Sequence, residues 1–178
     1  MANILIVSAV FRPEPVVSAK LSEDLANELG KKNKVIVIAP FPTRPFGFKF
    51  IKMEVAANYQ LINLSSYTCA KSNVIGRLIE SFSFGYACTK YIKKNRFTID
   101  QIYMSSWPIF AQYLTVKTAF RYNIPIVTHV QDVYPEALAA KMPILGFLLN
   151  VTLMPFDKMI LERSKSVIAI SEKMKRHL

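Results

Sequence analysis

Short apolar runs alternate along this chain with longer segments in which apolar residues recur every three or four positions. Runs rich in β-branched residues predict buried parallel strands. They cover residues 3–10, 34–39, 99–104, 125–130 and 166–170, with a weaker run at 59–65. The segments with helical periodicity predict helices. These helices cover residues 18–29, 74–94 and 109–122, one or two helices within 136–163, and a last helix capped by Ser171.

Alternation of strands with helices is typical of an α/β fold. The connections wind right-handed, so the pattern predicts a parallel sheet with helices on both faces. In such sheets ligands bind beyond the carboxyl ends of the strands. The segments in which to look for function are therefore the loops at 11–18, 40–57, 105–109 and 131–136.

Composition adds two expectations to this picture. The 178 residues suffice for one domain with its own core, and a mean hydropathy of +0.24 suggests apolar surface meant for a partner domain or a membrane. The longest uncharged run, Met142 to Phe156, is too short to span a bilayer and carries two prolines, so no transmembrane helix is expected. The net charge of +11 indicates an anionic partner: nucleic acid, anionic lipid or a phosphorylated small molecule.

Cysteine usage and the start of the chain favour a cytoplasmic location. The two cysteines, Cys69 and Cys88, have no metal-ligand spacing, so no metal site is expected. The chain leads directly into a strand-like run without a secretory signal. We therefore expect reduced thiols in a cytoplasmic protein.

The loop after the first strand excludes two classes of nucleotide-binding protein. A dinucleotide site in an α/β sheet needs G-x-G-x-x-G at this place, and residues 11–18 contain no glycine. The sequence has no G-x-x-x-x-G-K-[ST] motif either. We therefore expect neither an NAD or FAD site at this loop nor a P-loop NTPase.

Three segments of the chain together resemble one enzyme family. Residues 11–15 read FRPEP, 131–136 read QDVYPE, and 161–174 read LERSKSVIAISEKM. In order and spacing they are similar to the "FxPEPGG", "HDLWPE" or "RDLWPE", and "E-x-x-x-x-x-A-D-x-I-I-A-V-S-E-x-M" stretches in the N-terminal halves of family-4 retaining glycosyltransferases with the GT-B fold.

The resemblance implies that the chain is one Rossmann-like half of a GT-B fold, covering residues 1–178. In such enzymes two Rossmann-like domains face a cleft. The N-terminal domain mainly holds the acceptor, and the C-terminal domain holds the nucleotide-sugar and a paired-glutamate motif that this chain lacks. Transfer retains the anomeric configuration, usually without a bound metal. The donor implied is a UDP- or GDP-sugar, no cofactor is bound tightly, and the chain alone is expected to be inactive.

Two positions depart from the family pattern. The glycine pair that follows Pro-Glu-Pro in the family is Val16 and Val17 here, and β-branched side chains block a close backbone approach to phosphate. The frequent histidine before the aspartate is Gln131 here, which can hydrogen-bond but cannot take up a proton at neutral pH.

The candidate acceptor-binding residues all lie in the loops at the ligand edge. They are Glu14, Ser18, Trp107, Gln131, Asp132 and Tyr134. Structural roles stay open beside the functional ones: a solvated charge for Glu14, a helix N-cap for Asp132, and packing under a loop for the two aromatic residues. Catalytic residues are not identified. His129 and Asp132 are the candidates, and His129 equally fits a hydrogen-bonded histidine inside a strand.

Three segments suggest a membrane surface. Arg44, Lys49 and Lys52 alternate with aromatic residues, as in interfacial segments, and further cations lie at 90–96, where a solvated helix end is the alternative. Residues 142–161 either dock a membrane or the missing domain, or form a buried core helix. Peripheral attachment at the inner face of the membrane would suit a lipid-linked sugar acceptor.

Two functions remain from these arguments. The first is the acceptor-binding half of a retaining glycosyltransferase in cell-surface polysaccharide or glycolipid synthesis, whose partner is the missing C-terminal donor-binding domain. The second is a non-catalytic, membrane-recruiting Rossmann-like subunit that binds a separate catalytic chain. Nucleic acid is not expected as a partner, because the basic residues are scattered and no nucleic-acid motif occurs.

Overall fold

A six-stranded parallel sheet forms the centre of the molecule. The computed structural model describes residues 1–45, 47–48, 50, 57–70, 73–105, 108–131 and 146–176. The order across the sheet is β3-β2-β1-β4-β5-β6, with parallel pairing between every neighbouring pair. The strands are β1 (Asn3–Val7), β2 (Lys34–Pro40), β3 (Tyr59–Leu64), β4 (Gln101–Ser105), β5 (Ile126–Val130) and β6 (Ser166–Ala169).

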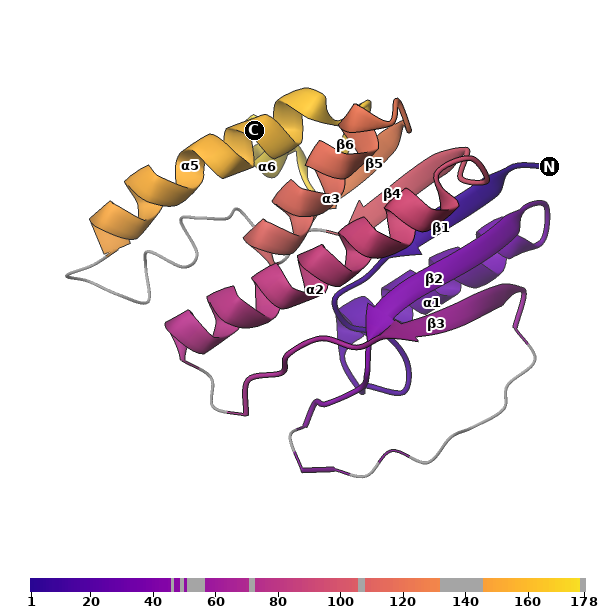
Figure 1. The fold of residues 1–178 in the computed structure, drawn as a ribbon, viewed down its shortest axis with the longest axis horizontal. Coiled ribbons are helices and arrows are strands. Elements are labelled where there is room, and N and C mark those ends of the chain that lie inside the picture. Colours follow the sequence, from indigo (N-terminus) through magenta and orange to yellow (C-terminus); the bar gives the residue numbers. More distant parts are fainter. Residues whose placement is uncertain are drawn as a thin grey trace.

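Helices cover both faces of the sheet, as the alternation predicts. Helix α1 (Val17–Gly30) lies behind the sheet in Figure 1, whereas α2 (Val74–Asn95), α3 (Ile109–Arg121) and α5 (Gly146–Arg163) lie side by side in front of it. The split follows from right-handed crossovers: the connections from β1 through β2 to β3 run in one direction across the sheet, and those from β3 through β4 and β5 to β6 run in the other. A short helix, α6 (Glu172–Lys175), follows β6, and the Ser171 hydroxyl caps it by accepting from Met174 N–H.

Two apolar clusters hold these layers together. The larger fills the space between the sheet and the α2, α3 and α5 layer, with Leu5, Ile102 and Ile126 facing Phe84, Val116 and Ile160. The smaller lies under α1. There Ile6 and Val37 pack with Phe11 and Ala26. Successive residues of β1 thus enter different clusters, which is why its run is apolar on both faces.

At two positions, Gly85 and Gly30, the absence of a side chain lets neighbouring segments of the chain pack closely. A Cβ atom at Gly85 would lie 2.7 Å from Ala111 Cα, where α2 packs on α3. At Gly30 a Cβ atom would meet the backbone carbonyl of Asn58. Helix α1 ends at Gly30, one residue beyond its expected range, and the residue after it is helical in backbone conformation, so close packing rather than a left-handed cap explains the glycine.

The sequence predicts no transmembrane helix in the apolar run at 142–156, and the described helices bear on that expectation. None of the helices in the described ranges is long and apolar enough to cross a bilayer. Within that run, α5 is described from Gly146, and it is not uniformly buried: Leu153 and Ile160 face the core while Phe147 is exposed. The buried-core interpretation of this segment therefore holds for one side of the helix only.

Candidate functional site

A pocket of about 1130 Å³ opens beside α1 at the ligand edge of the sheet. Its walls come from the loop at residues 12–17, from one side of α1, from the β2–β3 connection and from the outward-facing residues of β3. Apolar side chains such as Val16, Phe41 and Leu61 line most of it, together with a few polar groups. This mixture of apolar walls and sparse polar groups is typical of small-molecule sites.

The course of the chain after β2 explains the position of this pocket. Parallel neighbouring strands are usually joined by a helix that covers the sheet. The described residues of the connection from 41 to 58 form no helix, so β3 keeps its α1-side face partly open. Tyr59, Leu61 and Asn63 alternate along β3 toward that side and line the pocket.

A charged group lies at the α1 wall of the pocket. Arg12 Nε is 2.8 Å from Glu23 Oε1, and the Glu23 side chain is almost fully buried. The Tyr59 hydroxyl lies 3.4 Å from the same carboxylate oxygen. Burial, and then the Glu23 charge, raise the pKa of Tyr59 to about 12. Tyr59 therefore remains a hydrogen-bond donor at neutral pH, and Arg12 compensates the buried carboxylate.

Glu14 ties two loops together at the mouth of the pocket. Its Oε1 accepts hydrogen bonds from the backbone N–H groups of Thr43 at 2.7 Å and Arg44 at 2.9 Å. The residue is buried, and its Oε2 is buried without a hydrogen-bond partner. Among the interpretations open for Glu14, a solvated surface charge is wrong, since the carboxylate fixes the β2–β3 connection to the loop after β1. Its predicted contact with an acceptor hydroxyl remains a prediction.

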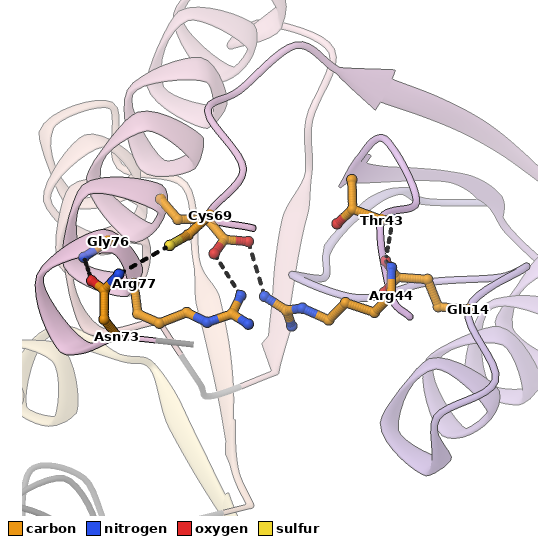
Figure 2. Close-up of polar contacts among 8 residues, drawn as sticks. Glu14, Thr43, Arg44, Cys69, Asn73, Gly76 and Arg77 are labelled. Carbon is orange, nitrogen blue, oxygen red and sulfur yellow. Dashed lines mark hydrogen bonds and ion pairs between the residues drawn. The ribbon is translucent and has the colours of Figure 1, made fainter. Parts of the chain in front are cut away.

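Arg44 joins the β2–β3 connection to helix α2, which lies on the other face of the sheet from α1. Its guanidinium lies 2.9 Å from Glu80 Oε1 on α2, and Arg77 lies 2.6 Å from the other oxygen of Glu80 (Figure 2). The three side chains are largely buried, and burial lowers the pKa of Arg44 while the Glu80 charge opposes that effect. The connection is thus fixed between the β1–α1 loop and α2. A membrane-surface role for Arg44 stays a prediction.

His129 lies within β5 and not at the pocket. Its Nδ1 is 2.6 Å from the Tyr103 hydroxyl on neighbouring β4, and burial lowers the pKa of His129. Alternation puts these side chains on the α1 side of the sheet, since Ile102 and Ile126 face the other cluster. The expectation of a hydrogen-bonded histidine inside a strand fits this geometry, and no described pocket brings His129 together with Glu14.

The other sequence candidates fall into two groups. Ser18 is half-buried in the first turn of α1 between two pocket-lining residues, and Gln131 directly follows β5. The remaining candidates, Trp107, Asp132, Tyr134, Lys49 and Lys52, lie outside the described residues. The structure therefore brings Glu14 and the start of α1 to one site and leaves the grouping of the others untested.

Several residues of the site were not found from sequence. Glu23, Tyr59, Arg77 and Glu80 sit inside regular helices or strands, where a charged or aromatic residue has no distinctive pattern. Arg77 and Glu80 are one turn apart on α2. Tyr59 and Glu23, and Glu80 and Arg44, are each 36 positions apart, so only the fold brings those pairs together. In the described ranges no group of three or more His, Cys, Asp or Glu side chains could hold a metal ion.

Comparisons with known proteins support the fold. The sequence matches no family model and no curated protein. The whole chain is similar to sucrose-phosphate synthase from Thermosynechococcus elongatus, with a TM-score of 0.70 at 13% identity over 44% of that structure. It is also similar to UDP-N-acetylglucosamine 2-epimerase from Rickettsia bellii, with a TM-score of 0.55 at 15% identity; 99% of the chain covers 41% of that structure. MurG from Acinetobacter baumannii matches at a TM-score of 0.49 and 11% identity, over 95% of the chain and 41% of that structure.

The chain spans less than half of the length of each of these structures. Its sheet order is that of a doubly wound nucleotide-binding fold. The expected fold class is confirmed: the chain has a Rossmann-like α/β fold that corresponds to one half of a GT-B fold.

Proposed function

We propose that this chain is the acceptor-side, N-terminal half of a nucleotide-sugar-dependent retaining glycosyltransferase. One observation carries the proposal: the entire chain superposes on 44% of sucrose-phosphate synthase with a TM-score of 0.70. A second Rossmann-like domain would then supply the donor site and the other wall of the cleft. The three sequence segments that resemble family-4 glycosyltransferases support the same assignment, and two of them follow β1 and β5 along the chain.

The pocket beside α1 supports an acceptor role more than a donor role. Its loop carries Val16 and Val17 where a backbone approach to phosphate needs glycine, and its walls are mainly apolar. The buried Glu23 and the half-buried Tyr59 offer hydrogen-bonding groups suited to hydroxyls. Under this proposal the donor is a UDP- or GDP-sugar held by the second domain, and the isolated chain does not transfer sugar.

Under this proposal the acceptor site serves the synthesis of cell-surface polysaccharide or glycolipid at a membrane. The net charge of +11 favours association with anionic lipids, and a lipid-linked sugar would combine an apolar portion with hydroxyl groups. Both features match a basic domain that has an apolar pocket with few polar groups.

The first test of the proposal is to sequence the gene, and the second is to assay the complete protein. The native reading frame is sequenced past Leu178, where a second Rossmann-like domain with two glutamates eight positions apart is expected. The complete protein is then assayed with UDP- and GDP-sugars and lipid-linked acceptors, and the anomeric configuration of the product is read by NMR. Retained configuration supports the proposal.

The isolated chain provides a separate test of the acceptor role. Saturation-transfer NMR is expected to show binding of acceptor sugars that weakens in a variant with Leu61→Trp, which fills the pocket. Tighter binding of nucleotide-sugars than of acceptors would contradict the acceptor assignment. A stop codon directly after codon 178 would instead direct attention to a non-catalytic subunit that recruits a separate catalytic chain.

A further inference from the structure

One face of helix α2 carries a continuous row of exposed side chains that is apolar in its N-terminal half and basic in its C-terminal half. Ile75, Ile79, Phe82 and Tyr86 recur at helical spacing, and each is at least half exposed. The same line continues at Lys90 and Lys93, which are also exposed. An amphipathic helix normally buries its apolar positions, so four large exposed apolar side chains in one row indicate a surface that is covered by something else.

Helix α5 repeats this arrangement on the same side of the sheet. Phe147, Val151 and Met154 recur at helical spacing, and each is at least half exposed. The line continues at the exposed Lys158. The N-terminal ends of α2 and α5 both lie on the side toward which the strands point (Figure 1). The apolar halves of the two stripes therefore share one end of the molecule, next to the ligand edge of the sheet.

Aromatic side chains of α3 join the two stripes. Phe82 of α2 meets Phe110 of α3 edge to face, with ring centroids 6.4 Å apart. Phe110 in turn meets Phe156 of α5 at 5.6 Å, and Tyr113 meets Phe156 at 4.8 Å. The half-buried rings of α3 thus connect the exposed rows on either side. We call the joined surface the α2–α3–α5 face; its exposed apolar residues are Ile75, Ile79, Phe82, Tyr86, Phe147, Val151 and Met154.

Cations border the apolar part of this face, and several of them stack on aromatic rings. Lys90 lies 4.6 Å from the ring centroid of Tyr86, and Lys117 lies 5.4 Å from that of Tyr113. Arg163 lies 4.3 Å from the ring centroid of Phe120. Aromatic rings beneath cationic side chains suit the boundary between lipid tails and headgroups, because the ring and the aliphatic stem stay apolar while the charge reaches the headgroups.

Acidic groups do little to offset these cations. The acidic residues of the three helices are Glu80, Asp157 and Glu162. Glu80 is held by Arg44 and Arg77 and is mostly buried, Asp157 is half-buried, and Glu162 lies 3.7 Å from Lys158. The cations of the three helices beyond these pairs are Lys90, Lys93, Lys94, Lys117, Arg121 and Arg163. The face therefore combines a connected apolar area with a positively charged border.

We propose that the α2–α3–α5 face docks onto an anionic lipid bilayer, with the apolar halves of α2 and α5 inserted among the headgroups. Charge complementarity favours lipid as the occupant, because anionic headgroups attract clustered lysine and arginine around an apolar area that enters the interface. The inserted end lies beside the ligand edge of the sheet. The assignment rests on the proposed function only in its link to a lipid-linked acceptor; lipid binding itself is measured without any transferase assay.

The test is co-sedimentation of the 178-residue chain with vesicles of phosphatidylcholine, with and without one third phosphatidylglycerol. The chain is expected to bind the anionic vesicles and to dissociate at high salt. The double variant Ile79→Ser and Phe147→Ser is expected to bind at least about tenfold more weakly, since two exposed apolar side chains no longer leave water. Its control is Leu21→Ser, an exposed apolar position on α1 across the sheet.

Two double variants with equal changes in charge distinguish binding through this face from binding driven by the net positive charge of the whole chain. Lys93→Glu with Lys94→Glu reverses two cations on α2, and Lys31→Glu with Lys32→Glu reverses two exposed cations after α1. The first pair is expected to lower binding by about tenfold or more and the second to leave most of it, because only cations near the bilayer surface contribute. Circular dichroism verifies that all variants remain folded.

Three outcomes would overturn the proposal. The first is absence of binding to anionic vesicles at low salt. The second is equal loss of binding in both charge-reversal variants, which would indicate net charge alone. The third is a wild-type chain that ignores vesicles but dimerises in sedimentation velocity and loses that dimer with Ile79→Ser, which would assign the face to contact between copies. Failure of sugar transfer with intact lipid binding would contradict the proposed function and leave this inference standing.

Discussion

The hydroxyl oxygen of Tyr103 lies 2.6 Å from Nδ1 of His129, joining side chains of neighbouring strands on the α1 side of the sheet. Burial lowers the pKa of His129 below its ordinary value of 6.5, and the tyrosine hydroxyl can donate to the neutral ring. The pair thus favours an uncharged histidine inside the sheet.

This pair predicts a loss of stability in acid. A histidine with a lowered pKa in the folded state binds fewer protons there than in the unfolded state, so the free energy of unfolding falls as pH drops below about 6.5. Urea unfolding between pH 8 and pH 5 checks the trend, and His129→Asn is expected to flatten it. The chain has two histidines, so an NMR titration assigned with His177→Asn reads the pKa directly. A value at or above 6.5 for His129 would contradict the assignment.

Removal of the Glu14 carboxylate is expected to loosen the mouth of the pocket. Glu14→Ala leaves two backbone N–H groups, at Thr43 and Arg44, without their charged acceptor. We expect a loss of about 1 to 3 kcal/mol in the free energy of unfolding. Glu28→Ala is the control, because Glu28 is exposed and pairs with the exposed Lys31 three positions away. Equal costs for the two variants would show that the buried contacts of Glu14 do not stabilise the fold.

The cluster of Arg44, Glu80 and Arg77 predicts an asymmetry between partners. Glu80→Ala leaves two partly buried guanidinium groups without their shared carboxylate, whereas Arg44→Ala leaves Glu80 paired with Arg77. We expect Glu80→Ala to cost about 2 kcal/mol and Arg44→Ala about 1 kcal/mol or less. Chemical unfolding of both single variants and the double variant gives the coupling energy. A larger cost for Arg44→Ala than for Glu80→Ala would argue against Glu80 as the centre of the cluster.

Gly85 sets the distance between α2 and α3, so a methyl group there is expected to destabilise the protein. At an exposed helical position a change from glycine to alanine would add about 1 kcal/mol of stability. Here the new Cβ would lie 2.7 Å from Ala111 Cα, and relief requires the helices to move apart. Gly85→Ala is expected to lower the free energy of unfolding by about 1 to 3 kcal/mol. A rise in melting temperature would show that the two helices separate at little cost.

Much of the fold follows from local pattern. The runs at 34–39 and 125–130 became β2 and β5 almost unchanged, because a parallel strand buried on both faces must be apolar throughout. Helix α2 matches its expected range within one residue, since its apolar positions repeat with the helical period. The first strand is shorter than its run: β1 ends at Val7, and Ser8 turns its hydroxyl to Val10 and Ser22.

The sequence by itself determined the strand and helix succession, the basic charge and the loops that border the ligand edge, because each depends on neighbouring residues or on composition. The tertiary structure decided which of these residues meet. Glu14 bonds to the backbone of Thr43, Arg44 crosses to Glu80, and Tyr103 joins His129, over separations of 26 to 36 positions. It also decided that apolar residues of α2 and α5 stay exposed, because a helical pattern marks an apolar stripe without stating what covers it.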